Sequence, residues 1–345
     1  MPQRIEEIKT WLTSTLQTEI KRFEPASSDA SFRRYFRVTL QAIKHPDLAA
    51  QMTDPSFIVM DAPPEKENLS AFINIAGLLE ETGVKVPHLY AVDESQGFIL
   101  MSDLGTIPFL SLLAEDACIN NPQMADRLYA DAMQALLKMQ QGSVQYNNSH
   151  LPAYEPALLQ KEMELLPQWY IKVHLESTFS AAEQAVYQQA MQTLIDSAQA
   201  QPQVFVHRDY HSRNLMFQDE HNPGIIDFQD AVVGPVTYDL VSLLRDSYIA
   251  WPEAQVYAWV EQYRQLLLRA GILEHDDQAQ FMRWFDWMGV QRQLKVVGIF
   301  SRLNYRDGKS NYLNDIPLTL DYLLTVCAKY EQLADLNKLL KRLTS

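Results

Sequence analysis

The chain has 345 residues, of which 47% are hydrophobic and 10% aromatic, and its formal net charge is −14. A chain of this length exceeds the size at which one hydrophobic core usually divides, so we expect two lobes or two domains. The negative charge excludes nucleic acid and anionic membrane surfaces as general partners, and an anionic substrate would need a local cluster of Arg and Lys. Cys118 and Cys327 fit no disulfide or metal framework, and we expect two plain thiols in a reducing cytoplasm.

Apolar residues recur at helical spacing from Ile5 to Ile20 with charged residues between them, which predicts an amphipathic packing helix. No apolar run near the N-terminus is long enough for a signal sequence, and no later run approaches the ~20 residues of a membrane span. We therefore expect a soluble, cytoplasmic protein with no membrane partner.

Aromatic, β-branched and apolar runs predict strands in the first hundred residues, around one helix that ends before Gly83. We expect a polar turn entering a strand at 27–38, a strand at 57–60, the helix at 69–82 and a strand at 97–101.

Beyond Gly105 the pattern becomes almost wholly helical, and proline stands at several of the expected helix starts. We expect helices at 109–116, 122–141, 155–175 and 180–199, and a helical segment over 252–342. The change of pattern places the boundary between a first lobe, 1–104, and a second lobe, 105–345.

The central stretch VFVHRDYHSRNLMFQDEHNPGIIDFQD, at 204–230, combines two short apolar runs with polar side chains that follow each run. Carboxylates next to buried strands usually have a charged partner or hold a metal, because an unpaired buried charge is costly. His207, Asp209 and Asn214 reproduce the spacing H-R-D-x-x-x-x-N, in which the Asp accepts a substrate hydroxyl proton and the Asn holds a metal. Asp227 then stands where the kinase pattern has its second metal ligand.

Two histidines of this stretch, His207 and His211, also permit another interpretation. His211 lies inside the same segment, and His207 and His211 together with the aspartates could bind zinc in a metallohydrolase. The ordered Asp-to-Asn spacing followed by Asp227 fits magnesium better, since carboxylate and amide oxygens are hard donors.

HRDYHSRN and IIDFQDAVVGPVTYDL resemble the catalytic and metal-binding segments of the aminoglycoside phosphotransferase and choline kinase superfamily, small-molecule relatives of protein kinases. SDASFRRYFRV, FIVMDAPPEKEN, GFILMSDLG and GVQRQLKVVGIFSRL further resemble bacterial anomeric kinases of N-acetylmuramate and N-acetylglucosamine. The resemblance implies an α+β, two-lobed protein-kinase-like fold with a small antiparallel-sheet N-lobe and a mostly helical C-lobe. It also implies ATP and Mg²⁺ as cofactors, an amino sugar as acceptor, a sugar 1-phosphate as product, and a role in peptidoglycan recycling.

The resemblance assigns roles to the residues of the central stretch. Asp209 is the catalytic residue, Asn214 and Asp227 hold the metal, and His207 and Asp239 support the catalytic loop. It places the nucleotide in the N-lobe, at the polar turn and at a hinge whose backbone would bind adenine: Ser28, Ser31, Arg33, Met101, Asp103 and Leu104.

The kinase pattern also expects a lysine at about Met60 or Asp61, to bind the α- and β-phosphates, and the glycines of a phosphate loop. Both are missing. Lys66 or an Arg of the polar turn could replace the lysine, with Glu67 as its ion-pair partner.

The acceptor residues are the least defined. Five cations, Arg292, Lys295, Arg302, Arg306 and Lys309, follow one another in an acidic protein, and a solvated helix face is the simplest explanation. Alternatively, an Arg among them binds the lactyl carboxylate of N-acetylmuramate. The acceptor candidates are His211, Arg213, Arg292 and Arg306. We also expect a polar loop over 303–315 and one of the four tryptophans at 251, 259, 284 and 287 near the sugar.

Three other functions fit part of the sequence. The protein could be a kinase of another acceptor, such as an aminoglycoside, homoserine or choline. The missing lysine and glycines would suit a non-catalytic nucleotide-binding protein. The two histidines would suit a zinc hydrolase.

Overall fold

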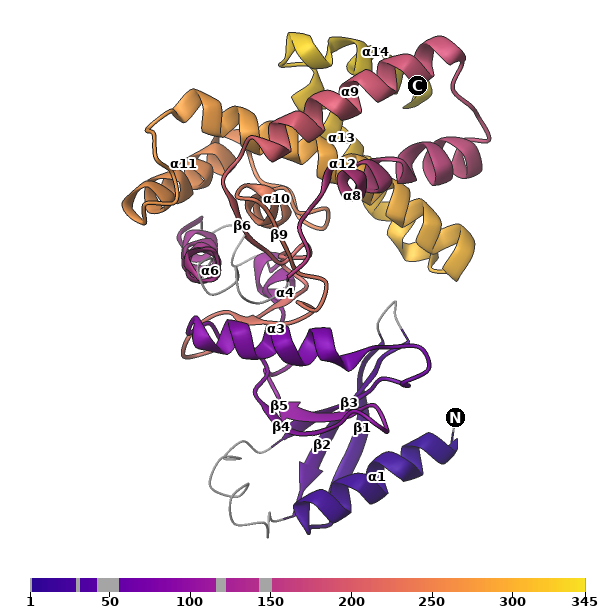
Figure 1. The fold of residues 1–345 in the computed structure, drawn as a ribbon, viewed down its shortest axis with the longest axis vertical. Helices are drawn as coiled ribbons and strands as arrows, with labels where there is room; N and C mark the ends of the chain where they lie inside the picture. Colours follow the sequence, from indigo (N-terminus) through magenta and orange to yellow (C-terminus); the bar gives the residue numbers. More distant parts are fainter. Residues whose placement is uncertain (1, 29–31, 42–55, 116–121, 143–150, 345) are drawn as a thin grey trace. The chain divides into compact units, whose positions relative to one another are not determined.

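The computed structural model describes residues 2–28, 32–41, 56–115, 122–142 and 151–344 (Figure 1). The chain folds as two compact units, of which one comprises Met1–Ile107 with Met216–Gln229 and the other Pro108–Leu215 with Asp230–Ser345. The first unit therefore contains a short segment from the middle of the chain. The division into lobes 1–104 and 105–345 stays a prediction.

The first unit is built on a five-stranded antiparallel sheet with the order β1-β2-β3-β5-β4. Its strands are β1 Ile20–Ser28, β2 Arg34–Leu40, β3 Phe57–Asp61, β4 Leu89–Asp93 and β5 Phe98–Ser102. The prediction of a strand before Val38 is confirmed by β2, and the other two predicted strands by β3 and β5. β1 was not expected, and it contains Pro25. A proline is tolerated there because β1 is an edge strand, where one missing N–H disrupts no second ladder.

The N-terminal helix α1, Pro2–Leu16, packs against this sheet (Figure 1). Ile8, Leu12 and Leu16 are fully buried against apolar side chains of β2, β3 and β5. The prediction that the helix continues to Ile20 is wrong. Gln17 has a φ of 50°, a left-handed conformation that ends the helix, and Ile20 begins β1.

Helix α3, Leu69–Glu81, starts at an N-cap where the Asn68 side chain accepts a hydrogen bond from the backbone N–H of Ser70. Its buried face includes Phe72. The segment from 216 joins the same unit, since Ile225 donates a backbone hydrogen bond to Lys85 at 2.7 Å. A two-stranded sheet of β7, Leu215–Met216, and β8, Gly224–Ile225, lies at this segment.

The second unit is mostly helical and includes one pair of antiparallel strands, β6 Gln203–Val206 and β9 Val232–Pro235. Its helices are α4 Phe109–Leu113, α6 Pro122–Gln141, α8 Pro156–Met163, the π-helix η1 Leu166–His174, α9 Ala181–Gln199, α10 Tyr238–Leu244, α11 Glu253–Arg269, α12 Gln278–Asp307, the 3₁₀ helix η2 Ser310–Asp315, α13 Ile316–Cys327, the 3₁₀ helix η3 Glu331–Leu333 and α14 Ala334–Thr344.

The helix α12 passes through the interior of this unit. Every residue from 285 to 298 is buried, so this segment has no solvated face. A Cβ atom on Gly298 would lie 2.3 Å from the backbone carbon of Leu165, and only glycine permits this close approach. The polar residues of α12 between these positions are therefore interior residues.

Two of the helical predictions differ from the structure. The expected helix over 155–175 is divided into α8 and the wider π-helix η1. The expected polar loop over 303–315 is mostly helical, because α12 continues to Asp307 and η2 follows Gly308, whose φ is 69°. The predicted fold class, an antiparallel sheet followed by a largely helical lobe, is confirmed. Within the described ranges no helix is long and apolar enough to cross a membrane.

Candidate active site

The predicted catalytic loop follows β6, and its first residues are held by a buried carboxylate. Asp239, in the first turn of α10, accepts backbone hydrogen bonds from His207 at 2.6 Å and from Arg208 at 3.0 Å. Arg208 has a φ of 77°, so the two N–H groups converge on one side chain. Burial raises the pKa of Asp239 to about 7, although the two N–H groups favour its ionised form.

A second buried aspartate holds the middle of the loop. Asp246, which follows α10, accepts hydrogen bonds from the backbone N–H of Ser212 at 3.0 Å and from its hydroxyl group. It also accepts one from the backbone N–H of Tyr248. The sequence analysis did not identify Asp246. Its position seven residues after Asp239, two helical turns along the same segment, is the signal that could have indicated it.

Arg208 belongs to a buried ionic cluster that the sequence analysis also missed. Its guanidinium lies 2.5 Å from Glu162, whose carboxylate is 3.1 Å from the ammonium of Lys295 and accepts hydrogen bonds from Tyr154 and Gln291. Burial alone would raise the pKa of Glu162, but Lys295 and Arg208 lower it below its usual value. The cluster fixes the loop to α8 and α12. Glu162 follows Gln160 and Lys161 in the sequence, so its neighbours gave no sign that it is buried.

Asp209 lies at the centre of this framework and is half-buried. Within the described part of the chain its carboxylate accepts no hydrogen bond, whereas its backbone carbonyl accepts them from His211 and Asn214. Burial opposes ionisation, but the positive charges of Lys295, His211 and Arg292 lower the pKa of Asp209. An ionised carboxylate without a hydrogen-bond donor is suited to receive a substrate hydroxyl group.

The two predicted metal ligands lie in different units of the chain. In the second unit, Asn214 donates its side-chain N–H to the Asp209 carbonyl at 3.0 Å, which directs the amide, and the amide oxygen is the atom able to bind a cation. In the first unit, Asp227 has a φ of 66° and accepts a hydrogen bond from the Gln229 side chain. Both residues supply the oxygen donors that Mg²⁺ prefers.

Phe228, next to Asp227, is fully buried and stacks on Phe72 of α3, with ring centroids 4.9 Å apart. The stacked ring anchors the segment that carries Asp227 to α3. Gln229 stands where protein kinases have glycine, and its side chain binds Asp227 directly.

In the polar turn, Ser28 is the last residue of β1 and Ser31 lies outside the described residues. Arg33 lies next to Glu67, with its Nε 3.7 Å from a carboxylate oxygen, and the other oxygen accepts the backbone N–H of Phe32. The structure therefore brings Glu67 together with a cation of the turn. Lys66 instead lies over the ring of Phe32, 4.5 Å from its centroid.

Of the two positions at which the kinase pattern expects its lysine, Met60 and Asp61, the second is a fully buried aspartate. Asp61, the last residue of β3, forms ion pairs with Arg4 of α1, at 2.5 Å, and with Arg34 of β2. Arg34 is its direct cross-strand neighbour. At this end of β3 the charges are therefore a buried carboxylate and two guanidinium groups from neighbouring elements, and no lysine is present.

At the predicted hinge, Asp103 forms a two-pronged ion pair with Arg37, at 2.6 and 3.0 Å, and accepts the backbone N–H of Gly105. The carbonyl of Leu104 accepts a hydrogen bond from the Gln218 side chain, and Met101 lies within β5. The Asp103 side chain therefore holds the chain that follows β5. Burial alone would raise the pKa of Asp103, but these hydrogen bonds and the charge of Arg37 leave it below its usual value.

The acceptor candidates differ strongly in their surroundings. His211 stacks edge-on against Tyr248, and burial lowers its pKa. Arg213 lies over the same ring at 3.5 Å and also faces Tyr312 of η2. These two tyrosines, which the sequence analysis did not identify, supply aromatic faces beside the catalytic loop.

The explanation of a solvated helix face is wrong for the first two cations of the basic segment, because Arg292 and Lys295 are buried. Lys295 is paired with Glu162 and donates to the Tyr238 hydroxyl at 2.9 Å. The Nε and Nη1 atoms of Arg292 are buried and have no hydrogen-bond partner among the residues the structure describes. Arg306 is exposed and paired with Asp307.

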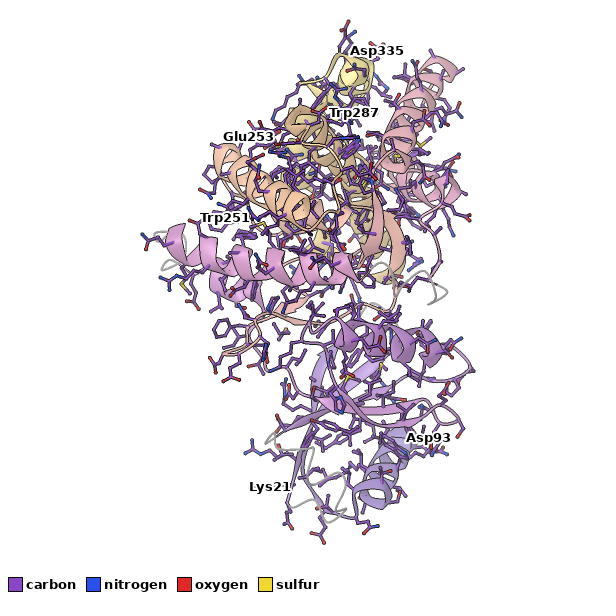
Figure 2. All side chains as sticks on the ribbon, turned by 60° about the vertical axis from the view of Figure 1, so that its left-hand side comes forward. Lys21, Asp93, Trp251, Glu253, Trp287 and Asp335 are labelled. Carbon is purple, nitrogen blue, oxygen red and sulfur yellow. The ribbon has the colours of Figure 1, made fainter. Side chains whose placement is uncertain are left out.

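The tryptophans mainly serve packing. Trp259 is buried and donates to Asp126, Trp251 donates to Tyr129, and Trp287 packs edge-on against Tyr330. Figure 2 shows Trp251 and Trp287 among the helices of the second unit. The aromatic rings near Asp209 are therefore tyrosines, and the expected tryptophan at the sugar has no support from these contacts.

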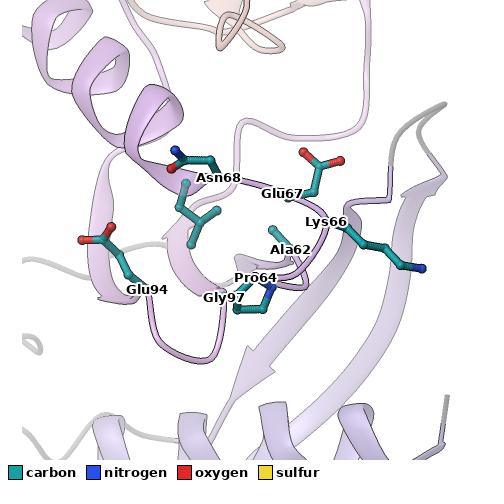
Figure 3. A pocket seen from close by; sticks show the side chains of 8 residues that line it. Ala62, Pro64, Lys66, Glu67, Asn68, Glu94 and Gly97 are labelled. Carbon is teal, nitrogen blue, oxygen red and sulfur yellow. The ribbon is translucent and has the colours of Figure 1, made fainter.

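Over the described ranges the structure contains no group of three or more His, Cys, Asp and Glu side chains able to hold a metal, which removes support from the zinc interpretation. A pocket of about 440 Å³ in the first unit is lined by Lys66, Glu67, Asn68 and Glu94, among others. Figure 3 shows Lys66, Glu67 and Glu94 around this pocket, so residues of both charges line it.

Comparison with known proteins agrees with this geometry. The family described as "Phosphotransferase enzyme family" matches residues 22–281. An N-acetylmuramate/N-acetylglucosamine kinase of Pseudomonas putida is 43% identical, over 99% of this chain and 96% of the relative. A protein of the same description from Pseudomonas aeruginosa is 42% identical, over 99% of this chain and 97% of the relative.

Among solved structures, a choline kinase from Streptococcus pneumoniae has a TM-score of 0.59 at 14% identity, covering 94% of this chain and 99% of that one. At this identity the likeness concerns the fold, and it confirms the predicted protein-kinase-like architecture. The family match covers most of the chain, and the two kinase relatives match it from end to end. The chain belongs to the phosphotransferase enzyme family.

Proposed function

We propose that the protein is an ATP-dependent kinase that phosphorylates the anomeric hydroxyl group of N-acetylmuramate and N-acetylglucosamine. The observation that carries the proposal is Asp209, an ionised, half-buried carboxylate on a loop that two buried aspartates hold in place. The descriptions of the relatives supply the acceptors. Because ATP is the phosphoryl donor, we place the reaction in the cytoplasm, within peptidoglycan recycling.

In this proposal Asp209 orients the anomeric hydroxyl group and takes its proton. The anomeric oxygen forms a bond to the γ-phosphorus, the bond from that phosphorus to the β–γ bridging oxygen breaks, and ADP leaves. Its lowered pKa keeps Asp209 ionised, so its carboxylate can both position the hydroxyl group and accept the proton as the bond to phosphorus forms. Asn214 and Asp227 hold Mg²⁺, which neutralises charge on the phosphate oxygens.

The test is ADP release with magnesium-ATP and four sugars: the two free amino sugars and their 1-O-methyl glycosides, which lack the anomeric hydroxyl group. We expect turnover of the free sugars and none of the glycosides. Turnover of the glycosides would show that another hydroxyl group is attacked. Inactivity on all four would contradict the sugar assignment. A screen with aminoglycosides, homoserine and choline would then separate another kinase from a non-catalytic nucleotide-binding protein.

The metal assignment predicts that Asp227→Ala loses magnesium-dependent ATP binding, because an oxygen donor to the cation is removed. Binding of ATP measured by calorimetry, with and without Mg²⁺, checks this. We expect the magnesium dependence of the affinity to disappear in the variant and to persist in Asp219→Ala, an exposed aspartate of the same segment. Unchanged magnesium-ATP affinity in Asp227→Ala would remove it from the ligand set.

A further inference from the structure

Arg292 is an unusual arginine for a protein interior. It is 4% exposed, it lies in the fully buried part of α12, and its Nε and Nη1 atoms are buried without a hydrogen-bond partner in the described part of the chain. A buried cation without a partner is costly, and such groups are normally paired or replaced by apolar residues. Its presence therefore requires an explanation that the folded chain alone does not provide.

The neighbouring cations provide a contrast. Arg245 is equally buried, and its guanidinium lies 2.6 Å from Asp286. Lys295, one helical turn after Arg292, is paired with Glu162, and Arg208 shares that carboxylate. Each of these charges has a carboxylate of this chain beside it at ion-pair distance, whereas Arg292 has none among the residues that the structure describes.

Arg292 also lies at the catalytic loop. Its charge acts on Asp209, on His211 and on Tyr248, and it lowers the pKa of each. These three residues come from the loop and from the segment after α10. Lys295, one helical turn after Arg292, pairs with Glu162, which also binds Arg208 of the loop, so this part of α12 lies beside the catalytic loop. Arg292 forms no hydrogen bond with Asp209, and its donors remain available to another group.

The two sugars in the proposed function differ in one charged group. Both have an anomeric hydroxyl group and an acetamido group, but N-acetylmuramate carries in addition a lactyl ether that ends in a carboxylate. A guanidinium binds a carboxylate with two parallel N–H···O bonds, and the Nη2 atom of Arg292 completes such a fork with Nε or with Nη1.

We propose that Arg292 determines specificity by binding the lactyl carboxylate of N-acetylmuramate, and that it has no direct contact with N-acetylglucosamine. This inference rests on the proposed function. The carboxylate of the substrate provides the partner that the chain itself does not. The net charge of the protein, −14, makes such a local cation necessary for an anionic acceptor.

The experiment compares kcat/KM for the two sugars, at saturating magnesium-ATP, in the wild type, Arg292→Gln, Arg292→Lys and the matched control Arg283→Gln. Arg283 is an exposed arginine of the same helix. We expect Arg292→Gln to lower kcat/KM for N-acetylmuramate by roughly 10- to 100-fold, because charge-assisted hydrogen bonds are lost. The loss for N-acetylglucosamine should be smaller, because this sugar has no lactyl carboxylate and shares only the effect of Arg292 on the charge of Asp209. Arg292→Lys should fall between, since it keeps the charge and loses the fork.

If Arg292→Gln leaves the ratio of the two kcat/KM values unchanged, the proposal is overturned. An equal loss on both sugars would then assign Arg292 to the phosphoryl group or to Asp209. A wild type inactive on both sugars would contradict the proposed function instead.

Thermal unfolding supplies a readout that does not depend on activity. Without sugar, Arg292→Gln should unfold at the wild-type temperature or above, because an unpaired buried charge is removed. N-acetylmuramate should raise the unfolding temperature of the wild type and not of the variant, whereas N-acetylglucosamine should raise both equally. A variant that fails to fold, or that unfolds at a much lower temperature, would show that Arg292 is structural and overturn the inference.

Discussion

At the scale of single residues, the charge on Asp209 is set by its neighbours. Positive groups on the loop and on α12 lower its pKa against the effect of burial.

Asp209→Asn keeps the shape of the side chain and removes the proton acceptor. We expect turnover to fall by ~10²–10⁴ with little change in ATP affinity. Single-turnover kinetics and ATP binding check this, with Asp196→Asn on the exposed face of α9 as the control. Near-normal turnover would exclude Asp209 as the proton acceptor.

Asp239 gives the protein a defined pH dependence. Burial raises its pKa from 3.8 to about 7, so the native state binds one more proton than the unfolded chain between about pH 4 and pH 7. The stability that this group contributes is therefore fully present below its unfolded pKa and is lost as the pH rises through its folded value.

Asp239→Asn cannot titrate at this position. Between about pH 4 and pH 7, we expect the free energy of unfolding to decrease more in the wild type than in the variant. Urea unfolding at a series of pH values measures both curves. Parallel curves would mean that Asp239 keeps an ordinary pKa in the folded protein.

The sequence predicted the residues whose spacing is fixed by chemistry. His207, Asp209, Asn214 and Asp227 could be proposed because a proton acceptor and oxygen ligands must follow one another along a short loop, and their roles stay predictions. Glu162 and Asp246 could not be found in this way. They reach the loop from distant parts of the chain, and only the packed structure brings them to their partners.

At the scale of elements, the cluster around Glu162 joins α8, α12 and the catalytic loop. Glu162→Gln would leave the buried charges of Arg208 and Lys295 without a carboxylate. Breaking a buried ion pair in this way costs about 3–5 kcal/mol of unfolding free energy. Chemical denaturation measures the loss, and Glu164→Gln, half-buried just after α8, should change stability by less than about 0.5 kcal/mol.

A second variant isolates the charge effect. Adding Lys295→Met to Glu162→Gln removes one of the two unpaired cations, so the double variant should recover part of the lost stability. If the double variant is less stable than Glu162→Gln, packing and not charge accounts for the loss.

Helices were easier to predict than strands. The periodic pattern of α6 gave its bounds, Pro122–Gln141, correctly, because twenty residues repeat one apolar face. β1 contains charges and a proline and buries little surface, so its pattern was too weak to distinguish from a continuing helix. The π-helix η1 keeps a helical pattern while changing the hydrogen-bond register, which periodicity alone does not reveal.

At the scale of the whole molecule, the net charge of −14 opposes the approach of an anionic acceptor. Salt screens charges that lie more than about 10 Å apart at 0.1 M ionic strength, whereas a buried pair is screened much less. With magnesium-ATP saturating, we expect KM for N-acetylmuramate to fall by about two- to fivefold relative to that for N-acetylglucosamine as ionic strength rises from about 0.02 to 0.2 M. A relative rise in KM would show that local attraction outweighs the overall repulsion.

The overall fold was predictable because the catalytic and metal-binding segments resemble those of a known superfamily, and the pattern of strands followed by helices agrees with its fold. The return of residues 216–229 to the first unit was not, since it depends on contacts such as that between Phe228 and Phe72, which lie far apart in sequence. A boundary drawn from a change of pattern cannot show that the chain later crosses back.

Asp61 has a consequence for inhibitor design. Compounds that inhibit kinases often depend on the strand lysine, either as a hydrogen-bond donor or as a nucleophile for a covalent group. Here neither Met60 nor Asp61, where that lysine is expected, is a lysine, and Asp61 is a fully buried carboxylate between two guanidinium groups. A lysine-directed compound finds no target at this position. An inhibitor designed without a contact to the lysine would therefore lose no affinity for this protein. It would bind less tightly to kinases that keep the lysine, because one contact is missing there.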